Sequence, residues 1–285
     1  DLAVNCAAGA TTAIYPNTTG DDFAHIITHS ESRIFVAENA EQLAKLRANS
    51  ELAAQVRSVV LIDGDDDADD VITLAELRER GVAHLAERPD AVRGAIASTD
   101  HDTLATLIYT SGTTGLPKGV RLTHLNWLYQ GEAVADLDIL YPEDVQYLWL
   151  PLAHVFGRDL IAIQVAIGFA TAVDGRLDRI VPGLGAVHPT FMCGAPRIFE
   201  KVRAAVIDAN SSGIKAKIAR WAFSVGLKSN PYRLAGRPMP ALLAAQYKVA
   251  DRLVFSKLQA RMGGNIRFFI SGSAKLSSRS RMSGW

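Results

Sequence analysis

The sequence predicts an α/β fold in which helices pack on largely parallel sheets. Short runs of β-branched and aromatic residues alternate along the chain with stretches in which apolar residues recur every three or four positions. Chains with this alternation usually join parallel strands by covering helices. The 285 residues, of which 48% are hydrophobic and 21% charged, are enough for one large domain or two modest ones.

Six strands are expected, each a short apolar run that ends at polar or turn-forming residues. They cover residues 34–37, 59–62, 104–110, 147–150, 190–193 and 266–270. Helices are expected over 40–48 and after Thr123, whose hydroxyl suits a helix N-cap. The apolar stretch 160–173 is shorter than the roughly 20 residues of a membrane span, so it predicts a buried helix that runs into a strand.

A long amphipathic helix is predicted toward the end of the chain. Its apolar positions recur at spacings of three and four: Leu243, Tyr247, Ala250, Val254, Leu258 and Met262. The pair Gly263–Gly264 is the expected end of this helix. We interpret it as a helix that packs on a hydrophobic core.

Charge and cysteine content argue against several functional classes. Thirty basic residues balance thirty acidic ones, which removes the cationic field of a dedicated nucleic-acid-binding protein, so no nucleic-acid partner is expected. Cys6 and Cys193 are the only cysteines, too few for a disulfide scaffold or a cysteine zinc site. Such sparse cysteine fits a reducing, cytoplasmic location.

Two groups of possible metal ligands do not match the motifs that bind metal ions. The acidic run 63–70 lacks the glycine and the glutamate that an EF-hand loop requires at fixed positions. His25 and His29 are one helical turn apart, but Ile26 stands where the zinc-protease motif has its glutamate. We therefore expect a solvated loop and two surface histidines, and no metal site.

The segment 107–120 predicts a polyphosphate site. An apolar strand runs into small and hydroxyl-bearing residues, which end at Pro117 and Lys118. Small side chains let backbone N–H groups approach an anion, hydroxyls donate to phosphate oxygens, and lysine adds a point charge. Pro117 and Gly119 both break the Walker A pattern. A flexible polar linker would not explain the rigid Pro117–Lys118 ending.

The string YTSGTTGLPKGV at 109–120 resembles the phosphate loop of the adenylate-forming (AMP-binding) superfamily, which includes acyl-CoA synthetases, luciferases and the adenylation domains of peptide synthetases. Further segments resemble motifs of that superfamily in their order and spacing. They lie at 9–17, 151–158 (PLAHVFGR), 194–202 (GAPRIFEKV) and 267–274 (RFFISGSA). The last three are similar to motifs of the long-chain fatty-acid–CoA ligase branch.

This resemblance implies that a fatty acid is activated by ATP to an acyl-adenylate and then joined to coenzyme A, with Mg²⁺ as the metal cofactor. The residues implied to contact ATP are Thr110, Ser111, Gly112, Thr113, Thr114, Gly115, Lys118, Ser273 and Ala274. Lys118 and His154 are implied to be catalytic, with His154 beside the acyl carboxylate and the α-phosphate. A structural histidine in the core is the alternative for His154. Lys275 replaces a proline of the motif, so the adenine contact is less closely matched.

The resemblance also implies a domain organisation. Residues 1–276 match part of the large N-terminal adenylation domain, residues 277–285 do not resemble the family, and the small C-terminal domain is absent. We therefore expect a fragment with little or no ligase activity on its own. Two alternatives stay open: a nucleotide-binding module without catalysis, and an adenylating ligase for another carboxylic acid.

A basic stretch lies within the neutral total. Residues 209–250 contain no acidic residue, and Trp221, Phe223 and Tyr232 lie among the basic ones. The basic residues are Lys215, Lys217, Arg220, Lys228, Arg233, Arg237 and Lys248. Three interpretations are open: a solvated helix face, a surface for the phosphates of coenzyme A, and peripheral contact with anionic lipid headgroups.

Overall fold

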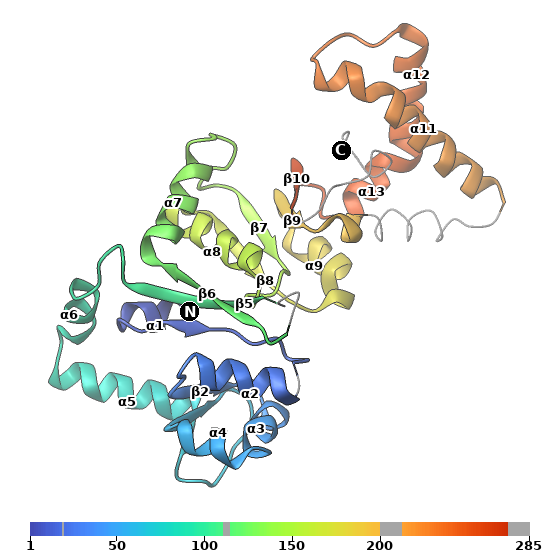
Figure 1. The fold of residues 1–285 in the computed structure, drawn as a ribbon. Coiled ribbons are helices and arrows are strands. Elements are labelled where there is room, and N and C mark those ends of the chain that lie inside the picture. The colour runs from blue at the N-terminus through green and yellow to red at the C-terminus, as the bar shows by residue number, and fades with distance from the viewer. Residues whose placement is uncertain (19, 111–114, 200–212, 273–285) are drawn as a thin grey trace. The chain divides into compact units, whose positions relative to one another are not determined.

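The computed structural model describes residues 1–18, 20–110, 115–199 and 213–272 (Figure 1). The chain divides into two compact units. The first contains Asp1–Gln130 and Leu152–Val155, and the second contains Gly131–Pro151 and Phe156–Trp285. Each unit has its own β-sheets and its own hydrophobic clusters.

Two three-stranded sheets form the first unit. In one, β1 (Thr11–Thr12) pairs parallel with β5 (Leu104–Thr110), which pairs antiparallel with β6 (Lys118–Thr123). In the other, β2 (Ile34–Ala37), β3 (Ser58–Leu61) and β4 (Val71–Thr73) are all parallel. The helices are α1 (Leu2–Cys6), α2 (Gly20–His29), α3 (Ala40–Arg47), α4 (Ser50–Gln55), α5 (Leu74–Glu87), α6 (Ala91–Ala97) and the first part of α7 (His124–Ala135).

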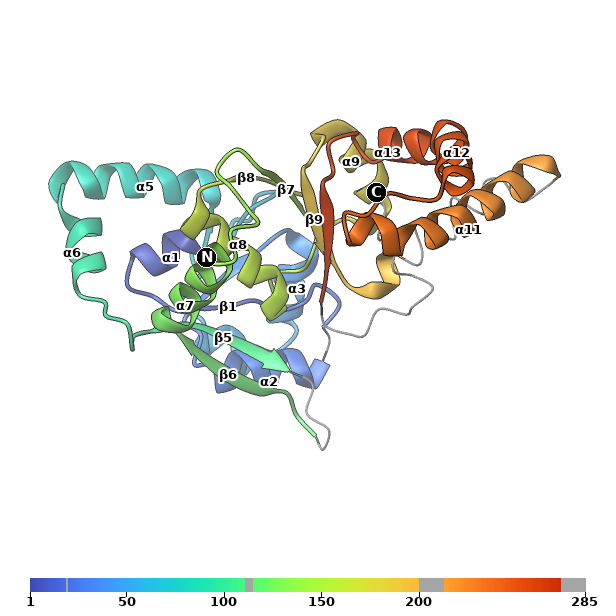
Figure 2. The same cartoon turned by 90° about the horizontal axis from the view of Figure 1, so that it is seen from above.

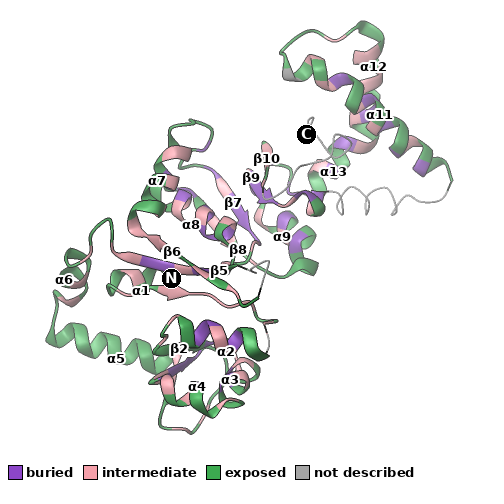
Figure 3. Cartoon of the chain, in the orientation of Figure 1, coloured by how far each residue is buried: buried purple, intermediate pink, exposed green. Residues whose placement is uncertain are grey.

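The parallel sheet of the first unit packs against α2, α3 and α4, whose apolar side chains share its hydrophobic core (Figure 3). The buried members include Phe23, Ile27, Leu43, Leu46, Leu52, Val59, Leu61 and Val71. Helices α3 and α4 begin after Asn39 and Asn49, whose side chains accept hydrogen bonds from backbone N–H groups of the first turn. The acidic run 63–70 is a loop before β4, as predicted.

The second unit is built on one parallel sheet with the strand order β10–β9–β7–β8. Figure 2 labels three of these strands, β7, β8 and β9. The strands are β7 (Val145–Leu148), β8 (Ala170–Val173), β9 (Phe191–Gly194) and β10 (Phe268–Ser271). The helical elements are α8 (Val155–Ile167), η1 (Leu177–Arg179), α9 (Ile180–Val187), α11 (Ile214–Leu234), α12 (Ala241–Ala250), η2 (Asp251–Phe255) and α13 (Ser256–Arg261). Cys193 in β9 is buried, and this burial raises the pKa of its thiol to about 12.

All six predicted strands are present. Strands β2 and β5 have the predicted bounds, and the others differ from the prediction by one or two residues. The stretch 160–173 forms most of α8 followed by β8, as expected. The prediction missed β1, β4 and β6. It missed β6 because Lys118 and Arg121 interrupt the apolar pattern of this edge strand.

The long helix predicted near the end of the chain is confirmed. It runs through α12, the π-helical turn η2 and α13, and it ends before Gly263 and Gly264, which have φ values of +91° and +79°. Ala250, Leu258 and Met262 are its buried members on the predicted apolar face. The expected glycine pair therefore does close the helix in the left-handed conformation.

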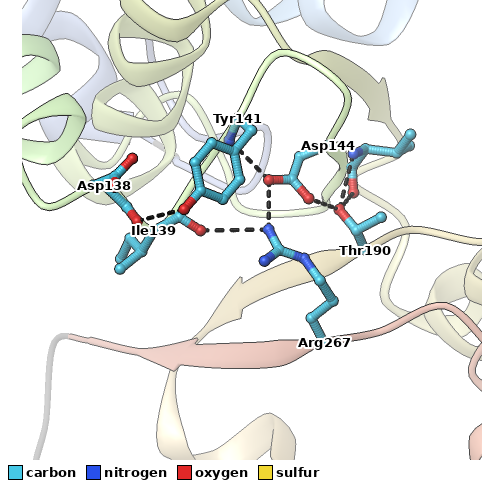
Figure 4. A network of polar contacts seen from close by, with 7 residues as sticks. Asp138, Ile139, Tyr141, Asp144, Thr190 and Arg267 are labelled. Carbon is cyan, nitrogen blue, oxygen red and sulfur yellow. Dashed lines mark hydrogen bonds and ion pairs between the residues drawn. The ribbon is translucent and has the colours of Figure 1, made fainter.

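Three residues that stand directly before neighbouring parallel strands meet through hydrogen bonds (Figure 4). Asp144 precedes β7, Thr190 precedes β9 and Arg267 precedes β10. The Asp144 carboxylate accepts from Thr190 Oγ1 at 2.6 Å and from Arg267 Nη2 at 2.5 Å. It also accepts from the backbone N–H of Tyr141 at 2.9 Å. This group, which we call the amino-edge clamp, ties together the amino ends of three strands.

The acidic member of the amino-edge clamp is ionised in spite of its burial. Asp144 is only 3% exposed. Burial raises the pKa of its carboxyl, but hydrogen bonds from Thr190, Arg267 and the Tyr141 backbone leave that pKa below its ordinary value. The carboxylate therefore stabilises the fold above the unfolded-state pKa of about 4, and this contribution is lost as the pH falls through the lower pKa of the folded state.

Asp144→Asn is expected to lower the free energy of unfolding at neutral pH by about 1–3 kcal/mol, because the donors from Thr190, Arg267 and the Tyr141 backbone lose the buried anionic acceptor. Chemical denaturation measures the change, and Asp138→Asn, at an exposed carboxylate of the same segment, is the control that should change little. The difference between the wild type and Asp144→Asn should shrink below about pH 4. A difference that does not depend on pH would contradict the role of the ionised carboxylate.

Candidate functional site

The β5–β6 hairpin brackets the predicted phosphate-binding segment. Thr110 ends β5, Lys118 begins β6, and the two residues are direct cross-strand partners. Both are exposed, and Gly115 has φ of +145°, which L side chains rarely adopt. The implied contacts Ser111, Gly112, Thr113 and Thr114 lie outside the described residues. The hairpin thus brings one hydroxyl and one ammonium group to adjacent positions.

Two histidines of α2 contact this hairpin. His25 Nε2 lies 2.9 Å from the carbonyl oxygen of Pro117, and His29 Nδ1 lies 2.7 Å from the hydroxyl of Tyr109. The expectation of two surface histidines therefore holds for His29, which is exposed, and is wrong for His25, which is half-buried. Residues about 80 to 90 positions apart meet here, so no local sequence signal could have revealed these contacts. No group of three metal-ligating side chains occurs among the residues that the structure describes.

In the second unit, motif segments meet at the carboxyl edge of the parallel sheet. The N–H of Gly272, which follows β10, donates to the carbonyl of Gly194 at the end of β9 at 3.2 Å. A Cβ added to Gly272 would lie 2.9 Å from the Phe156 ring, and one added to Gly194 would lie 2.8 Å from Ile198. Parts of the motifs at 151–158, 194–202 and 267–274 are therefore in contact. Ligands of α/β sheets bind beyond the carboxyl ends of strands.

The PLAHVFGR segment enters α8 through a tight turn. A Cβ at Gly157 would lie 2.5 Å from the Pro151 carbonyl oxygen, so only glycine allows this approach. His154 stands directly before α8 and is exposed, which does not fit a buried structural histidine. Arg158, the last residue of the motif, is 5% exposed, and burial lowers the pKa of its guanidinium to about 10. Arg158 therefore carries its charge at neutral pH. Ser273 and Ala274 lie outside the described residues.

The basic stretch forms α11, α12 and the segment between them. Exposed residues recur along one side of α11 at helical spacing: Lys217, Arg220, Trp221, Leu227 and Lys228. We call this set the α11 stripe. Phe223 and Tyr232 are half-buried, so of the three predicted aromatic residues only Trp221 is exposed. Among the described helices, none is long and apolar enough to cross a membrane.

Comparison with known protein families and curated proteins yields one family. Residues 1–281 match the model of the AMP-binding enzyme family. The long-chain-fatty-acid–CoA ligase FadD15 of Mycobacterium bovis is 30% identical over 285 residues, covering 98% of this chain and 46% of that protein. The long-chain-fatty-acid–CoA ligase ACSBG2 of Homo sapiens is 30% identical over 282 residues, covering 95% and 41%. The chain spans less than half the length of these curated relatives.

Solved structures confirm the predicted α/β fold. The A-PCP didomain of carboxylic acid reductase from Segniliparus rugosus, in complex with AMP, matches with a TM-score of 0.59 at 20% identity, over 95% of this chain and 36% of that one. A long-chain-fatty-acid–CoA ligase (FadD1) from Archaeoglobus fulgidus matches with a TM-score of 0.54 at 19% identity, over 73% and 39%. At these identities the likeness concerns the fold alone.

Gly157→Ala is expected to lower the free energy of unfolding by about 1–3 kcal/mol, because its Cβ would overlap a backbone carbonyl that cannot rotate away. Gly185→Ala is the matched helical control, since the nearest atom to its Cβ would be 3.8 Å away. That control should be neutral or slightly stabilising. Equal midpoints of denaturation for the two variants would contradict the tight turn at Pro151.

Proposed function

Because the chain belongs to the AMP-binding enzyme family, we propose that it serves the ATP-dependent activation of a fatty acid, first to an acyl-adenylate and then to an acyl-CoA. The two fatty-acid–CoA ligases that are 30% identical over nearly the whole chain support this choice of substrate. The chain spans less than half of each relative. The two-step reaction is therefore proposed for the whole protein, with little or no ligase activity in the matched part alone.

The Thr110–Lys118 pair is the observation that carries this proposal. A hydroxyl donor and a cation on adjacent positions suit the β- and γ-phosphates of ATP and the departing pyrophosphate. Negative charge moves onto pyrophosphate as the fatty-acid carboxylate attacks the α-phosphorus. Groups held at this place stabilise that charge without having to reorganise. Ser111, Gly112, Thr113, Thr114 and Gly115 are proposed to add backbone and hydroxyl donors.

The remaining site residues have proposed roles in the same reaction. His154 is proposed to lie beside the acyl carboxylate and the α-phosphate, where its exposed ring can donate a hydrogen bond. Ser273 and Ala274 are proposed to line the adenine. Mg²⁺ is proposed to accompany the ATP phosphates, because proteins usually bind this ion through substrate phosphates together with one or two carboxylates. No cluster of metal-ligating side chains occurs in the described ranges, so we assign no protein ligand to the ion.

Two alternatives have distinct signatures. A nucleotide-binding module without catalysis would bind ATP and give no fatty-acid-dependent exchange of pyrophosphate into ATP. An adenylating ligase for another acid would give exchange with an aryl or amino acid and not with a fatty acid. A panel of carboxylic acids, assayed with the complete protein, separates the three.

Lys118→Ala is expected to weaken ATP binding to the chain about 10- to 100-fold, the loss that follows removal of one charge-assisted hydrogen bond. Calorimetric titration with ATP measures it. Arg121→Ala removes an exposed cation from the same strand and is the matched control, which should bind ATP like the wild type. Equal affinities in the two variants would remove Lys118 from the proposed site.

A second proposal concerns the α11 stripe, which we assign to peripheral contact with the anionic lipids of the cytoplasmic face of a membrane. Lys217, Arg220 and Lys228 supply positive charge beside the apolar side chains of Trp221 and Leu227. Buried residues such as Ala222 and Val225 occupy the opposite side of the helix. A helix face that combines cations with apolar side chains suits the headgroup region of a bilayer.

Replacing Lys217, Arg220 and Lys228 by glutamine should cost about 1 kcal/mol of membrane binding for each cation removed. The measurement is co-sedimentation with vesicles of phosphatidylcholine and phosphatidylserine, with pure phosphatidylcholine for comparison. Replacement of Arg78, Arg80 and Arg88, exposed on and just after α5, is the control. If the wild type does not sediment with the anionic vesicles at low salt, the α11 stripe is a solvated face or a surface for coenzyme A.

A further inference from the structure

Helix α2 presents different chemistry on its two sides. Phe23 and Ile27, four residues apart, are buried in the hydrophobic core of the β2–β3–β4 sheet. His25 and His29 have the same spacing and project from the opposite side, where their rings are 5.1 Å apart. The carbonyl of Ile27 also accepts a hydrogen bond from Gln55 of α4 at 2.9 Å. The helix is therefore fixed to the β2–β3–β4 sheet, while its histidines point away from that sheet.

Both histidines meet the β5–β6 hairpin, which belongs to the other sheet of the same unit. His25 Nε2 contacts the Pro117 carbonyl oxygen at 2.9 Å, and because that oxygen can only accept, the histidine must donate. His29 Nδ1 shares a hydrogen bond of 2.7 Å with the Tyr109 hydroxyl. The Tyr109 ring stands edge-on to both imidazoles, at 6.2 Å from His25 and 5.7 Å from His29.

The contacted residues are the immediate neighbours of the proposed phosphate-binding pair. Tyr109 precedes Thr110 in β5, and Pro117 precedes Lys118 in β6. Tyr109 and Gly119 are cross-strand partners, and a Cβ at Gly119 would lie 3.0 Å from the tyrosine ring. Glycine at this position therefore leaves room for the ring across the hairpin. His25 therefore contacts the residue before Lys118, and His29 contacts the residue before Thr110.

This hold matters because β6 is an edge strand. Among the strands that the structure describes, it pairs with β5 alone, so β5 is the one described strand that fixes its start at Lys118. Pro117 has no N–H to pair, and its carbonyl is the backbone group that His25 binds. An edge strand with few partners opens more readily than a central one. The hydrogen bond from His25 to the Pro117 carbonyl therefore restrains β6 directly before Lys118, where its pairing with β5 begins.

We infer that His25 and His29 are positioning residues that set the approach of Thr110 and Lys118 to the phosphates of a nucleoside triphosphate. They do so from α2, through Pro117 and Tyr109, and do not themselves contact the nucleotide. The inference rests on the proposed function for its ligand. It adds two supporting contacts, from His25 and His29, that the sequence motif does not contain, since α2 lies about 80 residues before the hairpin.

The test compares His25→Ala, His25→Gln and Tyr109→Phe, with His84→Ala on the exposed helix α5 as the matched control. ATP affinity is measured by calorimetry, and amide hydrogen exchange is measured over residues 104–123. His25→Ala should weaken ATP binding about threefold to tenfold, the factor that one lost hydrogen bond gives, and speed exchange at the start of β6. Tyr109→Phe, which removes the partner of His29, should act in the same direction.

Rescue separates positioning from a general loss of structure. His25→Gln keeps a side-chain N–H donor and should recover most of the ATP affinity, while His84→Ala should match the wild type. ATP affinity unchanged in His25→Ala would overturn the inference, even if exchange increased. If the wild-type chain binds no ATP, the proposed function fails. The exchange data then test the positioning role of His25 by themselves, and unchanged exchange in His25→Ala overturns that role.

Discussion

A single buried carboxylate fixes the amino ends of three parallel strands in the second unit. Asp144 accepts hydrogen bonds from Thr190 and Arg267, so the starts of β7, β9 and β10 are held together. Each strand is four residues long, and strands rise about 3.3 Å per residue, so their far ends lie about 13 Å away. Because these parallel strands start side by side, they deliver the motif residues that follow them to one edge. The clamp itself takes no part in the proposed chemistry.

The contacts at the carboxyl edge depend on this register. Gly194 and Gly272 share a backbone hydrogen bond, and a Cβ added to either one would come within 3.0 Å of a neighbouring side chain. A one-residue slip of β10 against β9 would turn every side chain of the strand to the opposite face of the sheet. The hydrogen bonds of Asp144 at the amino edge of the sheet and the glycine contacts at its carboxyl edge therefore favour the same strand register.

Local patterns predicted most of the strands. Apolar runs located β2 and β5 to the residue, because their ends coincide with polar or turn-forming residues. The same rule placed β7 two residues late, since the strand includes Gln146, a polar residue that is fully buried. It missed β6 altogether, because an edge strand tolerates the charges of Lys118 and Arg121. The motif strings, for their part, marked residues that the structure places at the ends of the β5–β6 hairpin and at the carboxyl edge of the second sheet.

The contacts that hold the site could not be predicted, because they join distant parts of the chain. Asp144 and Arg267 are 123 positions apart, and His25 and Pro117 are 92 apart. A histidine pair at helical spacing looks the same in sequence whether it binds a metal, meets water or supports a hairpin. Only the position of α2 beside the hairpin, set by the burial of Phe23 and Ile27, distinguishes these cases.

The placement of the two cysteines has a practical consequence. Cys193 lies in the middle of the sheet, and its raised pKa keeps the sulfur in the unreactive thiol form, whereas Cys6 is exposed. Alkylating reagents will therefore modify Cys6 first while the fold is intact. With Cys6 replaced by serine, the rate of alkylation at Cys193 measures how fast the sheet of the second unit opens.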